Sequence, residues 1–187
     1  MIRGLILLML SASGFAGAAA PSTWSIDPAR SRLEFTATYE GEAIQGIFKR
    51  FDTRLVFDPQ QLSGSELEVT VDVASADMDS QDVNEAIQDN DWFSVSRHPK
   101  AAFRSTTFES AGPDRYLAIG TLTVKGISRQ VSVPFRWSAS GDRGRMEGTV
   151  TLDRRDFGVG EGEWATGDVI GVSVEVRFDV ALTRGSG

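Results

Sequence analysis

Residues 169–182 read VIGVSVEVRFDVAL, and apolar side chains occupy every second position from Ile170 to Leu182. Most positions between them are polar or charged, with Glu175 and Arg177 near the middle. A repeat of two residues sends alternate side chains to opposite faces of an extended chain. The stretch therefore predicts a long β-strand that buries one face.

The same two-residue repeat returns along the chain upstream of this strand. It predicts about eight strands in all: one at Leu33, one or two through Ile44–Phe57, and others that begin near Glu66, Ala101, Tyr116, Arg129, Met146 and Val169. Turn residues separate the runs, as in Ala111-Gly112-Pro113-Asp114 and Ser140-Gly141-Asp142. Turns of this composition favour antiparallel hairpins between neighbouring strands.

Residues 80–91 break the alternation. Ser80 suits the N-cap of a helix, and Asp82 suits its first turn. Val83 and Ile87 follow at helical spacing, so this segment predicts one short helix.

The length of the predicted strands favours a closed sheet over an open one. Long strands expose many unpaired backbone groups at a sheet edge, and closure into a barrel removes that edge, whereas a sandwich keeps it. We therefore predict an all-β fold, an antiparallel eight-stranded barrel with one short helical insertion. A barrel of eight strands is either filled by its own side chains or wide enough for one small ligand.

The N-terminus has the order of a secretory signal peptide. A basic start at Arg3 is followed by the apolar run Gly4–Phe15 and by the small residues Ala16–Ala20. The apolar run is too short to remain comfortably as a membrane-spanning helix. We predict a signal peptide at residues 1–19, one domain at residues 20–187, and a periplasmic or secreted location.

The composition excludes most catalytic and metal-binding chemistry. The chain has no cysteine and one histidine, so thiolate nucleophiles, zinc fingers and iron–sulfur clusters are excluded. Its 26 acidic and 19 basic residues give a formal net charge of −7, which becomes one unit more negative without Arg3. This charge would repel nucleic acid and anionic membranes. We predict no nucleic-acid partner, no metal site and no enzymatic activity.

Three segments resemble functional sites, and each has a structural interpretation. The run Gly158–Gly162 lacks the following helix that a phosphate cradle needs, which favours a flexible strand connection. Arg154-Arg155 suits an anion or a salt-bridged surface pair, and the surface pair is favoured. Glu161 and Glu163 resemble the paired carboxylates of glycoside hydrolases, but a glycine-rich loop supplies none of the apolar environment that this chemistry needs.

The predicted inward face mixes large rings such as Phe35 and Phe103 with small residues such as Ala37 and Gly120. A packed core interdigitates large with small side chains. A tube that receives a chain-like ligand has the same composition. The sequence leaves both interpretations open.

Motifs in a fixed order span the predicted domain. They are Trp24-Ser25-Ile26-Asp27, Gly46-Ile47-Phe48, Asp91-Trp92-Phe93, residues 120–127 (GTLTVKGI) and Arg155-Asp156-Phe157-Gly158-Val159-Gly160. The ordered set resembles the YceI-like family. The resemblance implies a lipocalin-like barrel and an exported protein that holds polyisoprenoid chains, including quinone tails. The segments around Trp92 and Trp164 resemble the branch that accompanies membrane b-type cytochromes, which implies such a cytochrome as a partner; a homodimer is also left open.

The residues and the resemblance together predict an exported, non-catalytic binding protein. Its ligand would be an isoprenoid or similar amphiphilic lipid, such as a prenyl quinone, and no other cofactor is expected. The predicted lining residues are Phe35, Tyr39, Phe48, Phe103, Leu122, Phe135, Trp137 and Val174. One alternative is a secreted interaction module with a packed core that partners a membrane redox protein. Another is a hydrolase that uses Glu161, Glu163 or the aspartates of residues 77–91.

Overall fold

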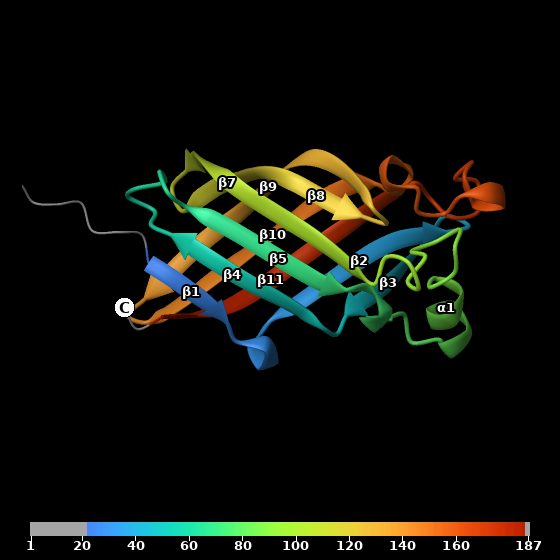
Figure 1. The fold of residues 1–187 in the computed structure, drawn as a ribbon, viewed down its shortest axis with the longest axis horizontal. Helices are drawn as coiled ribbons and strands as arrows, with labels where there is room; N and C mark the ends of the chain where they lie inside the picture. Colours follow the sequence, from blue (N-terminus) through green and yellow to red (C-terminus); the bar gives the residue numbers. More distant parts are fainter. Residues whose placement is uncertain (1–21, 186–187) are drawn as a thin grey trace, which may run out of the picture.

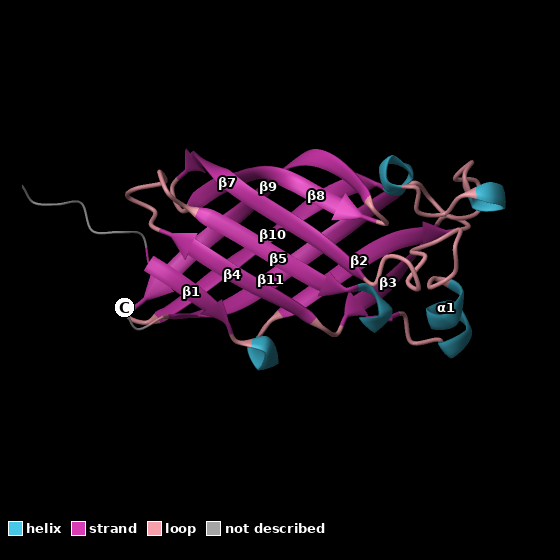
Figure 2. Cartoon of the chain, viewed as in Figure 1, coloured by secondary structure: helices cyan, strands magenta, loops and turns pink. Residues whose placement is uncertain are grey.

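A computed structural model describes residues 22–185 of the chain. The predicted signal peptide, residues 1–19, and the boundaries of the predicted domain lie outside the described residues. Within the described part, eleven strands form one sheet and a single α-helix lies beyond one end of it (Figures 1 and 2). No helix among residues 22–185 is long and apolar enough to span a membrane.

The elements follow the predicted alternation closely. The strands are β1 (Ser22–Ile26), β2 (Arg32–Tyr39), β3 (Glu42–Phe48), β4 (Phe51–Phe57), β5 (Glu66–Asp72), β6 (Ala76–Asp77), β7 (Lys100–Gly112), β8 (Arg115–Val124), β9 (Ile127–Ser140), β10 (Arg143–Asp153) and β11 (Ser173–Arg184). Helix α1 spans Gln81–Ala86, and 3-10 turns cover Pro28–Arg30, Val73–Ser75, Arg154–Phe157 and Gly162–Trp164. Ser80 caps α1 as expected, because its Oγ accepts the N–H of Val83 at 3.5 Å.

Eight of the strands close a ring in the order β1-β4-β5-β7-β8-β9-β10-β11, with β11 paired back to β1. The closing register joins Trp24 to Arg184 and Ile26 to Leu182, and all pairings are antiparallel. Strand β11 also pairs with β2, which carries β3 and then β6, so these three strands lengthen the wall beside α1. The predicted eight-stranded barrel is confirmed.

The alternation did not indicate the two-residue strand β6, nor did it indicate strand β1. Its five residues bury only Trp24 fully, so the two-residue repeat is too short to recognise. Its place is set by register with β4 and β11, which are distant in sequence.

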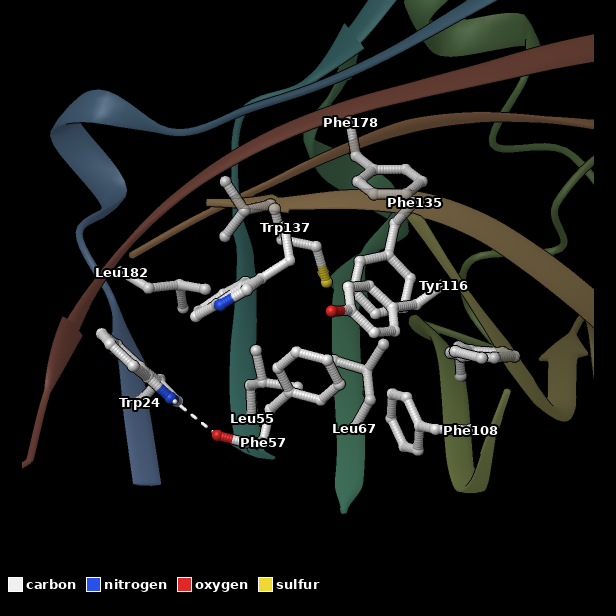
Figure 3. Close-up of a cluster of buried hydrophobic side chains, with 14 of the residues drawn as sticks. Trp24, Leu55, Phe57, Leu67, Phe108, Tyr116, Phe135, Trp137, Phe178 and Leu182 are labelled. Atoms are coloured by element: carbon white, nitrogen blue, oxygen red, sulfur yellow. Dashed lines mark hydrogen bonds between the residues drawn. The ribbon is translucent and has the colours of Figure 1, made fainter. Parts of the chain in front are cut away.

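The barrel is solid at the end that holds β1 and the end of β11. Figure 3 shows rings that meet there around Phe57, with centroid distances of 5.1 Å to Tyr116, 5.6 Å to Phe135 and 5.3 Å to Trp137. The indole N–H of Trp24 donates to the backbone carbonyl of Phe57 at 3.2 Å, so its polar atom is satisfied in the core. We call this cluster the aromatic plug; it comprises Trp24, Phe57, Phe108, Tyr116, Phe135 and Trp137.

Candidate functional site

The other half of the barrel encloses a cavity of about 790 Å³. This volume lies within the range of about 300 to 1,000 Å³ that small-molecule pockets occupy. Nearly all lining side chains are apolar; the polar or charged ones are Tyr39, Gln45, Thr53, Asp82 and Arg154. Residues shared with the core, such as Met146 and Phe178, form the floor above the aromatic plug. The interior is therefore packed at one end and hollow at the other.

The structure separates the eight predicted lining residues into two groups. Six line the cavity, namely Phe35, Tyr39, Phe48, Phe103, Leu122 and Val174. The other two, Phe135 and Trp137, lie outside the lining and belong to the aromatic plug, where each is 4% exposed. Alternation along a strand predicts whether a side chain points into the barrel, but not its position along the barrel axis. The sequence therefore does not distinguish the two groups.

Two segments at the α1 end of the barrel contact each other across the cavity, and we call them the cap: residues 78–98 and residues 154–171. The rings of Trp92 and Trp164 lie 5.8 Å apart, and both line the cavity. The N–H groups of Gly160 and Glu161 donate to the carbonyl of Asp91 at 2.7 and 2.9 Å. The cap is thus held by ring packing and by backbone hydrogen bonds between its two segments.

Arg154 organises the second segment of the cap. Its side chain is 5% exposed, and its Nε and Nη atoms donate to the carbonyls of Gly171 (3.0 Å), Val159 and Gly160 (both 2.8 Å), Ile170 (2.8 Å) and Trp164. These five bonds use all five N–H donors of a guanidinium group. Burial lowers the pKa of Arg154 from its ordinary value.

This arrangement corrects the surface-pair interpretation of Arg154-Arg155. Arg155 does form an exposed ion pair with Asp153, at 2.6 Å. Arg154 instead points inward, and its guanidinium lies 5.7 Å from the ring centre of Trp92. Gly160 takes a φ of +77°, and a Cβ at that position would overlap the guanidinium, so the glycine is required by the close approach of Arg154.

The glycine-rich connection is also fixed from outside the cap. Lys125 Nζ donates to the carbonyl of Gly158 at 2.5 Å and to Glu161 at 2.7 Å. Residues 158–162, which the sequence predicted to be a flexible connection, are therefore bound both by Arg154 within the cap and by Lys125 outside it. Neither Glu161 nor Glu163 lines the cavity, and residues 22–185 contain no group of three His, Asp or Glu side chains that could hold a metal ion.

Helix α1 is joined to the barrel wall through Asp77 and Asn84. The Asn84 amide donates to Asp77 at 2.8 Å and accepts the N–H of Met78 at 2.8 Å. Lys49 forms an ion pair with the same Asp77 carboxylate. Hydrogen bonds from Lys49, Asn84 and the Asp79 backbone lower the pKa of Asp77 from 3.8 to about 2.

The low pKa of Asp77 makes its contribution to stability dependent on pH. A carboxyl whose pKa is lower in the folded than in the unfolded state stabilises the fold above its unfolded pKa and loses that effect as the pH falls through its folded value. We expect Asp77→Asn to lower the free energy of unfolding above about pH 5. The difference should shrink below about pH 4 and be lost as the pH falls through the folded value of about 2. Urea unfolding of the natural chain and of Asp77→Asn across this pH range measures the difference in stability. A difference that is equal at every pH would contradict the prediction. In a Lys49→Met background, the effect of Asp77→Asn should be smaller.

The cavity reaches the surface between α1 and the hairpin of β2 and β3. All lining residues that are exposed belong to these two elements: Tyr39 and Gln45 on the hairpin, and Asp82, Val83 and Ala86 on α1. Tyr39 is 44% and Val83 38% exposed, although both side chains are largely apolar. We call this opening the mouth.

Sequence reasoning did not place the cap residues at the site. Trp92 and Trp164 stood out only within motifs of the family resemblance, and Arg154 was interpreted as a surface residue. The sequence feature that could have indicated them is tryptophan within otherwise polar, glycine-rich connections. A large ring outside the strands is usually buried against other apolar side chains.

Comparison with known proteins extends these observations. A family model described as the YceI-like domain matches residues 24–182. The UPF0312 protein of Ectopseudomonas mendocina is 29% identical to the chain, over 84% of this chain and 87% of that protein. A UPF0312 protein of Pectobacterium carotovorum is 26% identical, over 95% of this chain and 94% of that protein.

Solved structures share the same barrel. The crystal structure of BcnA from Burkholderia cenocepacia has a TM-score of 0.81 and 29% identity, and covers 83% of this chain and 98% of that one. A polyisoprenoid binding domain from Saccharophagus degradans has a TM-score of 0.69 and 14% identity, over 87% and 98% of the two chains. The second likeness is one of fold alone.

Proposed function

The chain belongs to the YceI-like domain family, and we propose that it is a non-catalytic carrier that holds the apolar chain of an amphiphilic lipid, such as a polyisoprenoid or prenyl quinone, in its barrel. The observation that carries this proposal is the apolar cavity of about 790 Å³ above the aromatic plug. The Saccharophagus degradans domain, described as polyisoprenoid binding, has the same fold and supports the proposal.

Apolar contact is sufficient to hold such a ligand. Burial gains about 0.8 kcal/mol per CH2, so a chain of about twenty carbons gains about 16 kcal/mol, against an association cost of about 4 to 15 kcal/mol. The floor formed with Met146 and Phe178 limits how deep the chain reaches, so the head group stays near the mouth. No catalytic group is needed for this role.

The carrier is proposed to act in the periplasm or outside the cell after loss of residues 1–19. The intact mass of protein purified from the periplasm tests this, since a retained N-terminus would contradict it. A membrane b-type cytochrome as partner stays a prediction of the resemblance, and the choice between monomer and homodimer stays open.

Organic extraction of natively purified protein tests the binding function. Mass spectrometry of the extract should recover an isoprenoid lipid in an amount comparable to the protein. Lipid-free protein should then take up a labelled prenyl quinone. Protein that is empty as purified and also fails to take up the quinone would contradict the proposal.

The alternative of an interaction module depended on a fully packed core. The hollow half of the barrel counts against it, because an empty apolar cavity forfeits packing contacts and has no structural benefit by itself. A ligand restores those contacts.

A further inference from the structure

This inference rests on the proposed function and concerns the head group of the ligand. Three segments surround the mouth: residues 39–45 of the β2–β3 hairpin, residues 78–90 with α1, and residues 165–170 of the cap. The third segment adjoins the first, because the N–H of Glu40 donates to the carbonyl of Val169 at 2.7 Å and Tyr39 pairs with Ile170.

The charges on these segments have one sign. They contain no lysine, arginine or histidine. Their seven acidic residues are Glu40, Glu42, Asp79, Asp82, Glu85, Asp89 and Asp168. Asp82 itself lines the cavity, so at least one acidic residue borders the place of a head group at the mouth.

Cations that contact these segments or their neighbours have partners of their own, and Arg97 donates to the Asn90 side chain at 2.9 Å. Lys49 pairs with Asp77, and Lys125 binds Glu161 together with the Gly158 carbonyl. Arg154 lines the cavity, but its five N–H donors all bind backbone carbonyls, so it can receive an anion only by releasing the cap.

Neutral partners are available at the mouth. The amide of Gln45 and the hydroxyl of Tyr39 are exposed lining groups that donate and accept hydrogen bonds. They suit a hydroxyl or a quinone carbonyl, and the exposed Val83 adds an apolar side chain to the mouth.

We propose that the mouth selects ligands by the charge of their head group: it accepts uncharged or cationic amphiphiles and rejects diphosphates and other anions of the same chain length. The apolar cavity treats these ligands alike, because they differ only at the head. The discrimination is therefore electrostatic, and it weakens as salt screens the carboxylates.

The test uses the lipid-free mature chain and three ligands with one prenyl tail. Geranylgeraniol, geranylgeranylamine and geranylgeranyl diphosphate each displace a neutral fluorescent apolar probe at low and high salt, below their aggregation concentrations. At low salt, we expect the diphosphate to bind on the order of a hundredfold more weakly than the alcohol, and the amine at least as tightly as the alcohol. The difference in affinity between the alcohol and the diphosphate should be smaller at high salt.

A matched pair of triple variants locates the effect. Glu40→Gln with Glu85→Gln and Asp168→Asn removes three charges around the mouth, and should reduce the ratio between alcohol and diphosphate affinities by about tenfold. Glu66→Gln with Asp114→Asn and Asp142→Asn removes three exposed charges at the aromatic plug end and should leave that ratio unchanged.

Each outcome is decisive. Equal or tighter binding of the diphosphate by the natural chain overturns the inference while the carrier function stands, and so does an equal effect of the two triple variants. Failure of all three ligands to displace the probe overturns the carrier function itself, and the inference with it.

Discussion

Replacing Arg154 with methionine is expected to lower the free energy of unfolding by about 3 to 5 kcal/mol, because several buried carbonyls lose their donors at about 1 to 3 kcal/mol each and relaxation of the loop recovers part of that cost. The methionine keeps most of the length of the apolar stem but loses the guanidinium, which lies over the Trp92 ring. Urea unfolding measures the loss, and amide hydrogen exchange should show residues 158–171 losing protection.

Arg155→Met is the matched control for this substitution. Arg155 is adjacent in sequence, but its ion pair with Asp153 is half exposed, and such surface pairs contribute little to stability. Arg154→Lys keeps the charge, but an ammonium has three donors on a flexible stem and cannot reach five carbonyls, so it should restore only a small part of the loss. Equal stability of the two methionine variants would contradict the role assigned to Arg154.

The contrast between these two arginines shows where prediction from sequence stops. Arg155 pairs with a carboxylate two residues away, a partner that a local pattern can suggest. Arg154 bonds to backbone carbonyls of residues 159 to 171, and every residue type carries such a carbonyl. Nothing in the residue identities marks which carbonyls converge, because their convergence is a property of the folded loop.

The barrel itself was predictable for the opposite reason. Alternation in strands such as β11 is a local pattern that fixes which face of the strand is buried. Eight such strands joined by short turns form one sheet, and closing that sheet into a barrel is the direct way to leave no strand edge exposed. Position along the barrel axis is not local. Phe103 and Phe135 alternate in the same way, yet one borders the cavity and the other lies in the aromatic plug.

Division of the interior into a solid and a hollow half predicts that stability and binding respond to different residues. Phe57→Ala removes the ring around which the aromatic plug packs and should cost about 3 to 5 kcal/mol of unfolding free energy. Because Phe57 does not line the cavity, the affinity of the remaining folded protein for a prenyl quinone should be unchanged.

Val174→Trp should have the converse effect, since Val174 is half-buried and faces the cavity, where an added indole meets empty space. If the ring displaces about four methylene groups of the ligand, the loss of about 3 kcal/mol weakens binding by on the order of a hundredfold. Urea unfolding of the lipid-free variant should show stability equal to or above that of the natural chain, because the indole fills part of the cavity. Binding titrations of Val174→Trp and Phe57→Ala with a labelled prenyl quinone measure the expected difference in affinity. A Val174→Trp protein that folds and still binds at full affinity would place the ligand outside the barrel, and with it the carrier proposal would fail.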